Sequence, residues 1–301
     1  MTEPLTDGTT LLRSLDGDAL LVTGKDRVRW LNGMVTCDVA KIPVDGASYG
    51  LHVGKQGKIA AELWIVVGAA DVLVAVPPGR AAELAEALDR YLIMEDCVVA
   101  PAPGAWSFAL VLGPEAETLA RGARERGLRA GLGRRAGRPA AIVAGEPALV
   151  ASWCGEAAAR AGVIAADDAA WERARVELGL GAFGVDFDAT AYPQEAALEA
   201  DGVSFSKGCY LGQEAVFMMQ ERGHPPRRLV QLEVEGASLP EVGAPLATGD
   251  GAAVGAISTR VAAGDRVLAL GTVKWKQARP GTELVVDGRR AVVTPLLATS
   301  R

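Results

Sequence analysis

The sequence has little histidine and little cysteine, and these shortages exclude several kinds of site. Two histidines, His52 and His224, are too few for a metal site built from several imidazoles, and they leave little room for a Ser-His-Asp triad. The cysteines form no C-x-x-C pair, so a self-contained zinc or iron–sulfur site is not expected. Two disulfides are the weaker expectation in a chain of 301 residues without a secretory signal. The four cysteines are Cys37, Cys97, Cys154 and Cys209.

An excess of basic charge and a long hydrophobic run are also missing. The net charge is −6 and the pI is about 5.2, which argues against a protein that holds nucleic acid by phosphate contacts. The most apolar stretch, residues 63–76, is interrupted by Gly68 and Asp71 and is too short to span a bilayer. Residues 1–7 are polar and acidic and do not resemble a signal peptide. We therefore expect a soluble, cytoplasmic protein with neither a nucleic-acid nor a membrane partner.

The composition supports a globular core, and the periodicity predicts an α+β fold. Half of the residues are hydrophobic and 23% are charged, and the length suggests two or three domains. After Pro225-Pro226, short strands alternate with Gly and Asp turns, which predicts a small antiparallel barrel or sandwich of about 75 residues. Strands are expected at 19–23, 48–53, 59–67, 72–76, 107–112, 227–234, 253–260, 266–275 and 283–293, and helices at 27–34, 80–94, 115–126 and 169–178.

Two further segments in the middle of the chain are read from their turn residues. Residues 127–139 are rich in arginine and glycine and are expected to form a basic loop, which is either solvated or binds a phosphate or a polyglutamate. Residues 140–144 and 148–153 are expected to form a hairpin around Gly145-Glu146-Pro147.

The most informative stretch is Lys207-Gly208-Cys209-Tyr210-Leu211-Gly212-Gln213-Glu214. Residues 203–205 read as a short strand before it, and Glu214 can open a helix after it, so we place the cysteine on a strand-to-helix turn. Glycines permit positive φ and close approach, and we expect the helix dipole and the Lys207 charge to favour the thiolate of Cys209. The alternative is that Cys209 is a small buried hydrophobe, as lone cysteines usually are.

The string K-G-C-Y-x-G-Q-E resembles the signature of the YgfZ-type folate-binding proteins, relatives of the glycine-cleavage aminomethyltransferase that are linked to iron–sulfur cluster maturation. Other segments are similar to motifs of the same family, and the resemblance covers nearly the whole chain. It is sharpest over residues 173–214 and only architectural after residue 227. The similar segments begin at Gly24-x-Asp26 with Trp30-Leu31-Asn32-Gly33, at Arg175-x-Glu177-x-Gly179, at Gly184-x-Asp186 and at Tyr192-Pro193-Gln194-Glu195.

The resemblance implies a three-lobed arrangement. Two α+β, ferredoxin-like subdomains would surround a central folate pocket, and a C-terminal antiparallel β-barrel would follow them. The implied boundaries are residues 1–45 with 165–226 for the first subdomain, 46–164 for the second and 227–301 for the barrel.

The resemblance also implies how tetrahydrofolate, or a one-carbon derivative of it, would be bound. Glu177 matches the position that accepts the N–H groups of the pterin. The alternative is that Glu177 and Arg175 are an ordinary charged pair at a polar helix end. Aromatic walls would come from Trp30, Tyr192 and Tyr210, and cations for the glutamate tail from Arg175, Arg222 and Arg228. Asn32, Glu62, Gln213 and Glu214 complete the expected set, and no metal ligands are expected.

Two departures from the aminomethyltransferases favour one of two functions. Those enzymes carry an Asp-Asp pair where this chain has Ala61-Glu62, and they lack the cysteine of K-G-C-Y. We therefore expect an accessory protein for iron–sulfur cluster assembly or repair whose partners are assembly or client proteins. The alternatives are a folate-dependent aminomethyltransferase and a scaffold that binds no ligand.

The role of Cys209 stays open among a nucleophile, a redox thiol or transient cluster ligand, and a packing residue. In the favoured arrangement Cys209 and Lys207 form the reactive group. The thiol and the Glu177 carboxylate would then face one central hollow.

Overall fold

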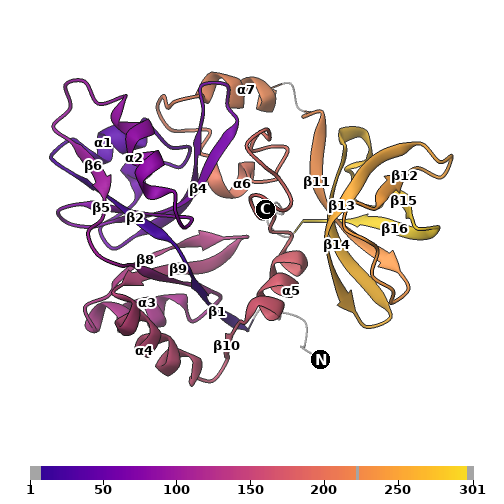
Figure 1. Ribbon diagram of the computed structural model, residues 1–301, viewed down its shortest axis with the longest axis horizontal. Helices are drawn as coiled ribbons and strands as arrows, with labels where there is room; N and C mark the ends of the chain where they lie inside the picture. Colours follow the sequence, from indigo (N-terminus) through magenta and orange to yellow (C-terminus); the bar gives the residue numbers. More distant parts are fainter. Residues whose placement is uncertain (1–7, 222–223, 297–301) are drawn as a thin grey trace.

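The computed structural model describes residues 8–221 and 224–296 (Figure 1). Two sheets with helices on their outer faces make up one part of the molecule, and a β-barrel lies beside them (Figure 1). The α+β class and the C-terminal barrel predicted from the sequence are confirmed. Among the described residues, no helix combines the length and the apolar character that crossing a bilayer requires.

The first sheet has the strand order β3-β4-β5-β2-β6, and all of its neighbouring strands are antiparallel. Helices α1 (Arg27–Asn32) and α2 (Ala81–Asp89) contribute Leu31 and Leu88 to a core with one face of this sheet. Its strands are β2 (Asp18–Thr23), β3 (Ala47–Val53), β4 (Ile59–Val67), β5 (Val72–Val76) and β6 (Val98–Pro101).

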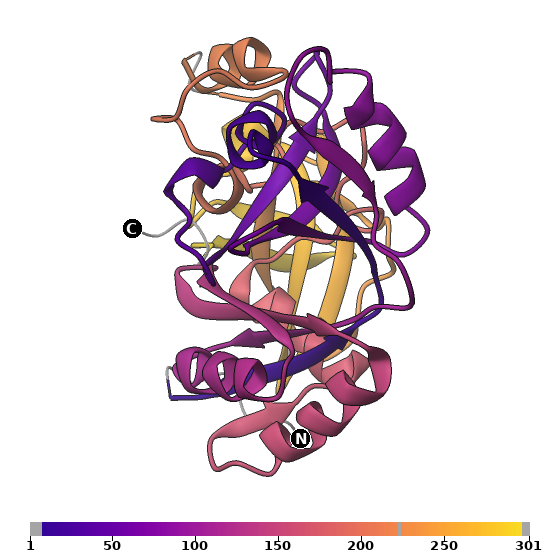
Figure 2. The ribbon, with the colours of Figure 1, turned by 90° about the vertical axis from the view of Figure 1, so that its left-hand side faces the viewer.

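The second sheet has the order β10-β1-β7-β9-β8, and only the pair β1–β10 is parallel. Its outer face packs on helices α3 (Ala116–Glu125) and α4 (Pro147–Ala158). The strands are β1 (Thr10–Leu15), β7 (Ser107–Leu112), β8 (Arg129–Arg135), β9 (Arg138–Gly145) and β10 (Val163–Ala165). Figure 2 shows the two sheets one above the other, with the barrel behind them.

The inner faces of the two sheets share one hydrophobic core because alternate strand residues point to opposite faces. Trp64 and Val66 of β4 join this core, whereas Ala61 and Ile65 of the same strand point toward α1 and α2. The sheets also meet at one edge, where Leu132 N donates a hydrogen bond to Asp45 O at 3.2 Å. Gly133 is required at this edge, since a Cβ there would lie 2.4 Å from the Ala47 carbonyl oxygen.

Helices α5 (Asp168–Leu178), α6 (Glu199–Gly202) and α7 (Gln213–Glu221) lie on the stretch that leads from the second sheet to the barrel. The barrel is closed in the order β11-β14-β13-β12-β15-β16. Its strands are β11 (Arg227–Glu235), β12 (Pro245–Ala247), β13 (Ala253–Ala263), β14 (Arg266–Lys274), β15 (Glu283–Val286) and β16 (Arg289–Thr294). Short 3₁₀ helices are η1 (Val39–Lys41) and η2 (Trp275–Gln277).

Three local predictions from the sequence are wrong. Residues 127–139 are not a basic loop, because most of them belong to strands β8 and β9. Residues 147–158 form helix α4 and not the second arm of a hairpin: the Glu146 carboxylate accepts hydrogen bonds from Ala148 N and Leu149 N, and Pro147 occupies the first turn. Residues 203–205 form no strand.

The membership of the sheets differs from the implied subdomain boundaries. Strands β1 and β2 both lie within residues 1–45 but belong to different sheets. Strands β3 to β6 and β7 to β9 are likewise divided between the two sheets, although all of them lie within residues 46–164. The boundaries stay a prediction about which segments form folding units.

Candidate functional site

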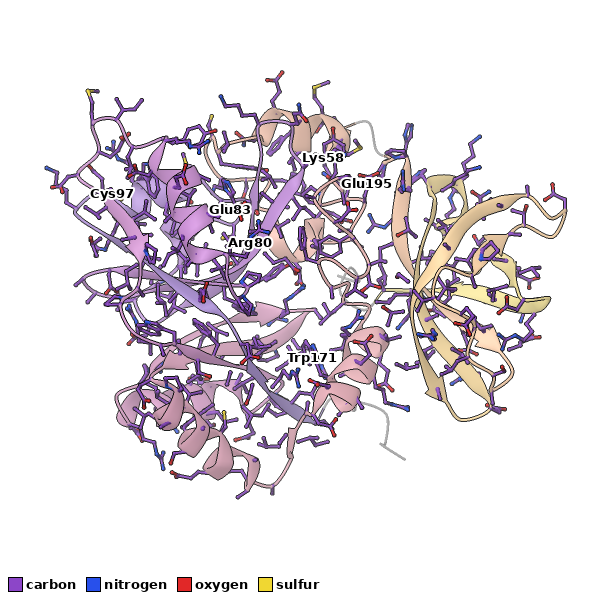
Figure 3. All side chains as sticks on the ribbon, in the orientation of Figure 1. Lys58, Arg80, Glu83, Cys97, Trp171 and Glu195 are labelled. Carbon is purple, nitrogen blue, oxygen red and sulfur yellow. The ribbon has the colours of Figure 1, made fainter. Side chains whose placement is uncertain are left out.

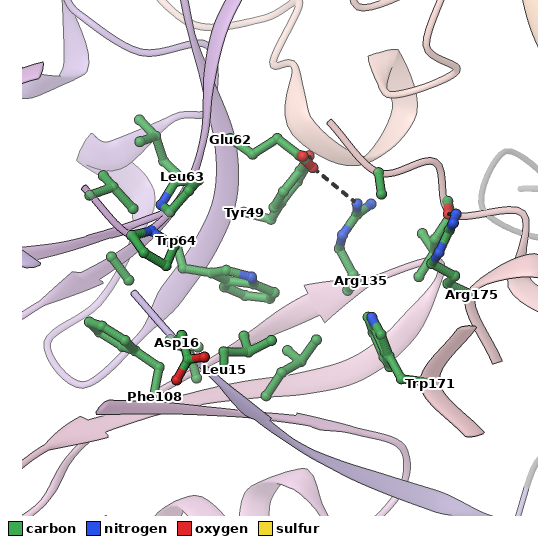
Figure 4. Close-up of a pocket in the computed structure, with 18 of the residues that line it drawn as sticks. Leu15, Asp16, Tyr49, Glu62, Leu63, Trp64, Phe108, Arg135, Trp171 and Arg175 are labelled. Atoms are coloured by element: carbon green, nitrogen blue, oxygen red, sulfur yellow. Dashed lines mark hydrogen bonds and ion pairs between the residues drawn. The ribbon is translucent and has the colours of Figure 1, made fainter. Parts of the chain in front are cut away.

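A cavity of about 280 Å³ lies between the inner faces of the two sheets and helix α5 (Figure 4). Its apolar walls come from both sheets, and Trp171 of α5 stands at one side of it (Figures 3 and 4). Three exposed residues, Asp16, Pro77 and Pro78, lie on its lining and form its mouth. The aromatic and aliphatic side chains on the walls are Trp64, Phe108, Leu110, Ile142, Trp171 and Leu180.

The cavity also holds a carboxylate that three other elements reach. Glu62 projects from β4, and its Oε1 accepts a hydrogen bond of 2.5 Å from the hydroxyl of Tyr49. Its Oε2 accepts from Phe183 N at 3.2 Å, and Arg135 Nη2 lies 4.0 Å from Oε1. A carboxylate oxygen can accept more than one hydrogen bond, so Glu62 retains acceptor capacity for a ligand.

Arg135 is the buried cation of this cluster. Its guanidinium lies over the Tyr49 ring, 3.8 Å from the ring centre, and forms an ion pair with Asp201 of α6. Asp201 also accepts hydrogen bonds from Ala136 N, at 2.9 Å to Oδ2. Burial, with the neighbouring Glu62 charge, holds the pKa of Tyr49 well above its usual value, so the phenol stays protonated and donates a hydrogen bond to Glu62.

Arg175 lines the same cavity, but its hydrogen bonds go to the protein. It pairs with Asp186 at 2.6 Å and with Glu172 through two bonds of 2.6 and 2.7 Å. Arg175 Nη2 also donates to Thr259 Oγ1 of β13, whose hydroxyl donates in turn to Asp186 Oδ1. Arg175 therefore links α5 to the barrel. Its guanidinium already has hydrogen-bond partners within the protein, although the side chain lines the cavity.

Glu177 does not line this cavity. It follows Arg175 by two residues, which on an α-helix is a rotation of about 200°. Its carboxylate pairs with Arg173 Nε at 2.7 Å, and the Arg173 guanidinium also donates to Ala262 O of the barrel. The structure therefore directs Glu177 toward the barrel side of α5, while Glu62 supplies the carboxylate of the cavity.

Lys207 is a buried amino group that holds a loop together. Its Nζ donates to the carbonyl oxygens of Asn32, Val35 and Cys37 at 2.5, 2.8 and 2.6 Å, which uses the three protons of an ammonium group. Burial lowers the pKa of Lys207 to about 8, although the nearby Cys37 and Asp38 act to raise it. Lys207 therefore ties the K-G-C-Y turn to the end of α1, a structural task that the sequence did not suggest.

Cys209 is an exposed free thiol on the turn that precedes α7, and it does not line the cavity. The expectation that Cys209 and Glu177 face one hollow is thus not met by this cavity, because the turn is held on α1 and the carboxylate points to the barrel. Of the two glycines in the motif, Gly212 has φ +76°, and a Cβ there would lie 2.3 Å from Gly54 O. Gly208 meets no such restriction.

The other residues expected at the site are spread over the molecule. Trp30 is buried among the core residues under α1, and Asn32 Oδ1 accepts from Ala40 N at 3.4 Å. Tyr210 is buried, and burial raises its pKa. Gln213 and Glu214 open helix α7.

Two further expected residues have partners of their own. The ring of Tyr192 lies 3.5 Å from Lys58 Nζ, and Lys58 also pairs with Glu195 at 3.5 Å (Figure 3). Arg228 donates to Gln194 O and pairs with Glu199 at 2.6 Å. Arg222 lies outside the described residues.

Sequence reasoning missed Tyr49, Trp64, Arg135, Trp171 and Asp201. Arg135 was placed in a basic loop, yet it lies in a strand and is only 6% exposed. A signal for Trp171 was available, since it lies four residues before Arg175 on a helix that was predicted, and residues at that spacing share a face.

Comparison with known proteins finds relatives of similar sequence. The tRNA-modifying protein YgfZ of Yersinia pseudotuberculosis is 27% identical over 249 residues, which cover 77% of this chain and 73% of that protein. The protein of the same name from Yersinia enterocolitica is 29% identical over 245 residues, with the same coverage. No protein-family model matches the chain.

One solved structure has a similar fold. The glycine cleavage system aminomethyltransferase T from Bartonella henselae superposes with a TM-score of 0.79 and 19% identity, covering 97% of this chain and 86% of that one. The chain is thus YgfZ-like in sequence and GcvT-like in fold.

Within this YgfZ/GcvT-like chain, only one of the two positions at Ala61-Glu62 faces the cavity. Adjacent strand residues point to opposite faces, and Ala61 is packed on the helix side of the first sheet. Among the described residues, no group of three or more His, Cys, Asp or Glu side chains is arranged to hold a metal ion. The cavity thus offers the Glu62 carboxylate inside, Asp16 at its mouth, the buried guanidinium groups of Arg135 and Arg175, and aromatic walls.

Proposed function

We propose that this YgfZ/GcvT-like protein binds tetrahydrofolate, or a one-carbon derivative of it, with the pterin in the cavity between the sheets. The observation that carries the proposal is the position of the Glu62 carboxylate among aromatic walls. A pterin is a flat ring with adjacent N–H donors, and such rings bind between apolar surfaces that carry a few fixed acceptors. Small-molecule sites begin at roughly 300 Å³, so a cavity of about 280 Å³ suits the ring end rather than a whole folate.

The residues that would hold the ligand follow from this placement. Glu62 would accept the N–H groups of the pterin, and Trp171 and Trp64 would form its walls. Tyr49 and Arg135 would fix the Glu62 side chain from behind, which keeps the acceptor oriented before the ligand arrives. Tetrahydrofolate would supply one-carbon chemistry when bound.

The test compares two carboxylates. We expect tetrahydrofolate at a hundred times its dissociation constant to raise the stability of the wild type by about 2.7 kcal/mol in a thermal-shift experiment. Glu62→Gln should weaken binding at least tenfold in calorimetry, while Glu177→Gln, on the other face of α5, should bind like the wild type. Absence of any shift with a panel of reduced folates would refute the proposal, and the reverse order of the variants would move the pterin to Glu177.

We further propose that the protein is an accessory factor for iron–sulfur cluster assembly or repair and that Cys209 acts on a partner protein. The support is the K-G-C-Y-x-G-Q-E signature together with the exposure of the free thiol. One cysteine cannot hold a cluster alone, so a cluster would be shared with another chain. The Yersinia relatives are named for tRNA modification, which suggests client enzymes that act on tRNA.

A deletion strain tests this second part. We expect lower activity of iron–sulfur enzymes and fewer modified nucleosides in its tRNA, and we expect the wild-type gene but not Cys209→Ser to restore both. Cys154→Ser, at a half-buried thiol on α4, is the matched control and should complement fully. Normal enzyme activities in the deletion strain would exclude the accessory role without affecting the folate proposal.

An aminomethyltransferase activity is not favoured by the geometry. Ala61 replaces one acid of the pair and points away from the cavity, so only one of the two positions, Glu62, places a carboxylate there. Release of methylene-tetrahydrofolate from an aminomethylated donor, lost in Glu62→Ala, would overturn this choice.

A further inference from the structure

A second hollow, of about 320 Å³, lies where the barrel meets helix α6. It is bounded by the start of β11, by η2 and the turn that follows it, and by the end of β16. It shares no lining residue with the cavity between the sheets. The folate proposal therefore leaves this hollow without a function.

The hollow contains an acceptor that the protein does not use. Glu199 Oε1 accepts a hydrogen bond from Arg228 Nη2 at 2.6 Å. Glu199 Oε2 is buried and has no hydrogen-bond partner among the described residues. Buried polar atoms are rarely left unpaired because the loss of hydration costs about 1–3 kcal/mol, and more for a charged group. A ligand with an N–H donor would remove this deficit.

The walls suit a flat ring. Trp275 of η2 lines the hollow and lies 5.8 Å, measured from its ring centre, from the Arg228 guanidinium. Leu229, Val230 and Leu296 supply aliphatic surface beside it. Aromatic side chains of this kind bind nucleobases by stacking, and each stacked base contributes about 1–3 kcal/mol.

The rim is cationic although the chain as a whole is acidic. Arg279 lines the hollow and is exposed, and Lys276 is exposed in η2 next to Trp275. Neither forms an ion pair with any described residue, so both charges are available to an anion. Arg227 and Lys274, which are paired across β11 and β14, extend the positive charge along the same end of the barrel.

We propose that this hollow binds a guanine nucleotide. The base lies against Trp275, its N1–H and 2-amino groups donate to the Glu199 carboxylate, and its phosphate meets Arg279 and Lys276. Guanine fits better than adenine because its N1–H and 2-amino groups are two adjacent donors. Glu199 can accept both, one at the unpaired Oε2 and one at the second lone pair of Oε1. The nucleotide is either free or an unstacked guanosine of single-stranded RNA, since the recognised chemistry is the same.

The experiment uses the full chain with GMP, AMP and tetrahydrofolate as probes in calorimetry. We expect GMP to bind at least tenfold more tightly than AMP. Glu199→Gln keeps the bond to Arg228 but presents an amide N–H in place of Oε2, so it should weaken GMP binding at least tenfold. Glu233→Gln, at a half-buried barrel carboxylate, is the matched control and should bind GMP like the wild type.

Two further measurements separate the sources and the alternatives. Arg279→Ala should weaken GMP but not guanosine, and a guanine-containing RNA pentamer that binds more tightly than GMP would identify RNA as the source. Failure of GMP to bind at millimolar concentration, equal binding of AMP, or an unchanged affinity in Glu199→Gln would each overturn the proposal. Tetrahydrofolate binding that depends on Glu199 and not on Glu62 would also overturn the proposal. Glu62→Gln should leave GMP binding intact.

Discussion

The hydroxyl of Tyr49 donates a 2.5 Å hydrogen bond to Glu62 Oε1, and this contact orients the Glu62 carboxylate on the wall of the cavity. Hydrogen bonds to a charged acceptor contribute about 1.5–3 kcal/mol. We expect Tyr49→Phe to lower the free energy of unfolding in urea by that amount and to weaken tetrahydrofolate binding. Tyr192→Phe is the control, since no hydrogen bond joins its hydroxyl to a described residue, and equal losses in the two variants would contradict the assignment.

Arg135 and Asp201 form a nearly buried ion pair, with side-chain exposures of 7% and 10%. Arg135→Met leaves the Asp201 carboxylate with the backbone N–H of Ala136 as its remaining donor among the described residues. We expect a loss of about 3–5 kcal/mol in urea unfolding, because removal of one partner leaves a buried charge uncompensated. Arg135→Met/Asp201→Asn should recover part of that loss. The exposed pair Arg90–Glu86 provides the control, and Arg90→Met should cause no measurable change.

His52 is a buried imidazole whose Nδ1 lies 3.0 Å from Met34 O, and burial lowers its pKa. Since the pKa in the unfolded chain is about 6.5, the unfolded chain binds more protons just below that pH. Stability should therefore fall as the pH drops below about 6.5, by up to about 1.4 kcal/mol per pH unit. Urea unfolding at pH 7.5 and 5.5 should show a smaller loss for His52→Asn than for the wild type or for His224→Asn. Parallel losses in all three chains would exclude His52 as the cause.

Lys207 should make the stability of the protein depend on pH in the alkaline range. Its pKa is lowered to about 8 in the folded chain, against about 10.4 for an unperturbed lysine, so between these values the unfolded chain binds more protons. This group alone makes stability rise with pH over that range. We expect Lys207→Met to be less stable than the wild type at pH 7, because three carbonyls lose their donor. The difference should grow from pH 8 to pH 10, whereas the exposed Lys25→Met should stay level with the wild type; a constant difference for Lys207→Met would contradict the lowered pKa.

The parts of the fold that follow from local pattern were predicted well. Strands β5 and β7 coincide with the predicted ranges 72–76 and 107–112, because short apolar runs between turn residues indicate buried strands. Strand β8 was read as a loop because its arginines and glycines look polar and flexible. Its Arg135 is buried by Asp201, which lies 66 residues further along the chain, and no local pattern shows such a partner.

The candidate site shows the same limit. Glu62 was expected from the family resemblance, and it does reach the cavity. Glu177 and Cys209 were expected there too, but the direction of a helical side chain and the place of a turn depend on neighbours such as Arg173 and the three carbonyls around Lys207. Those neighbours come from other elements, so the sequence motif alone could not place the two groups.

The hydrogen bond from Leu132 N to Asp45 O joins one sheet to the other. It lies beside Gly133, where the methyl group of an alanine would collide with the Ala47 carbonyl. Opposite walls of the cavity are thus parts of one continuous scaffold rather than two bodies joined by a hinge. Discrimination among reduced folates would then depend on how the ring fits a cavity of fixed shape. An inhibitor that matches this shape would bind without a preceding conformational change.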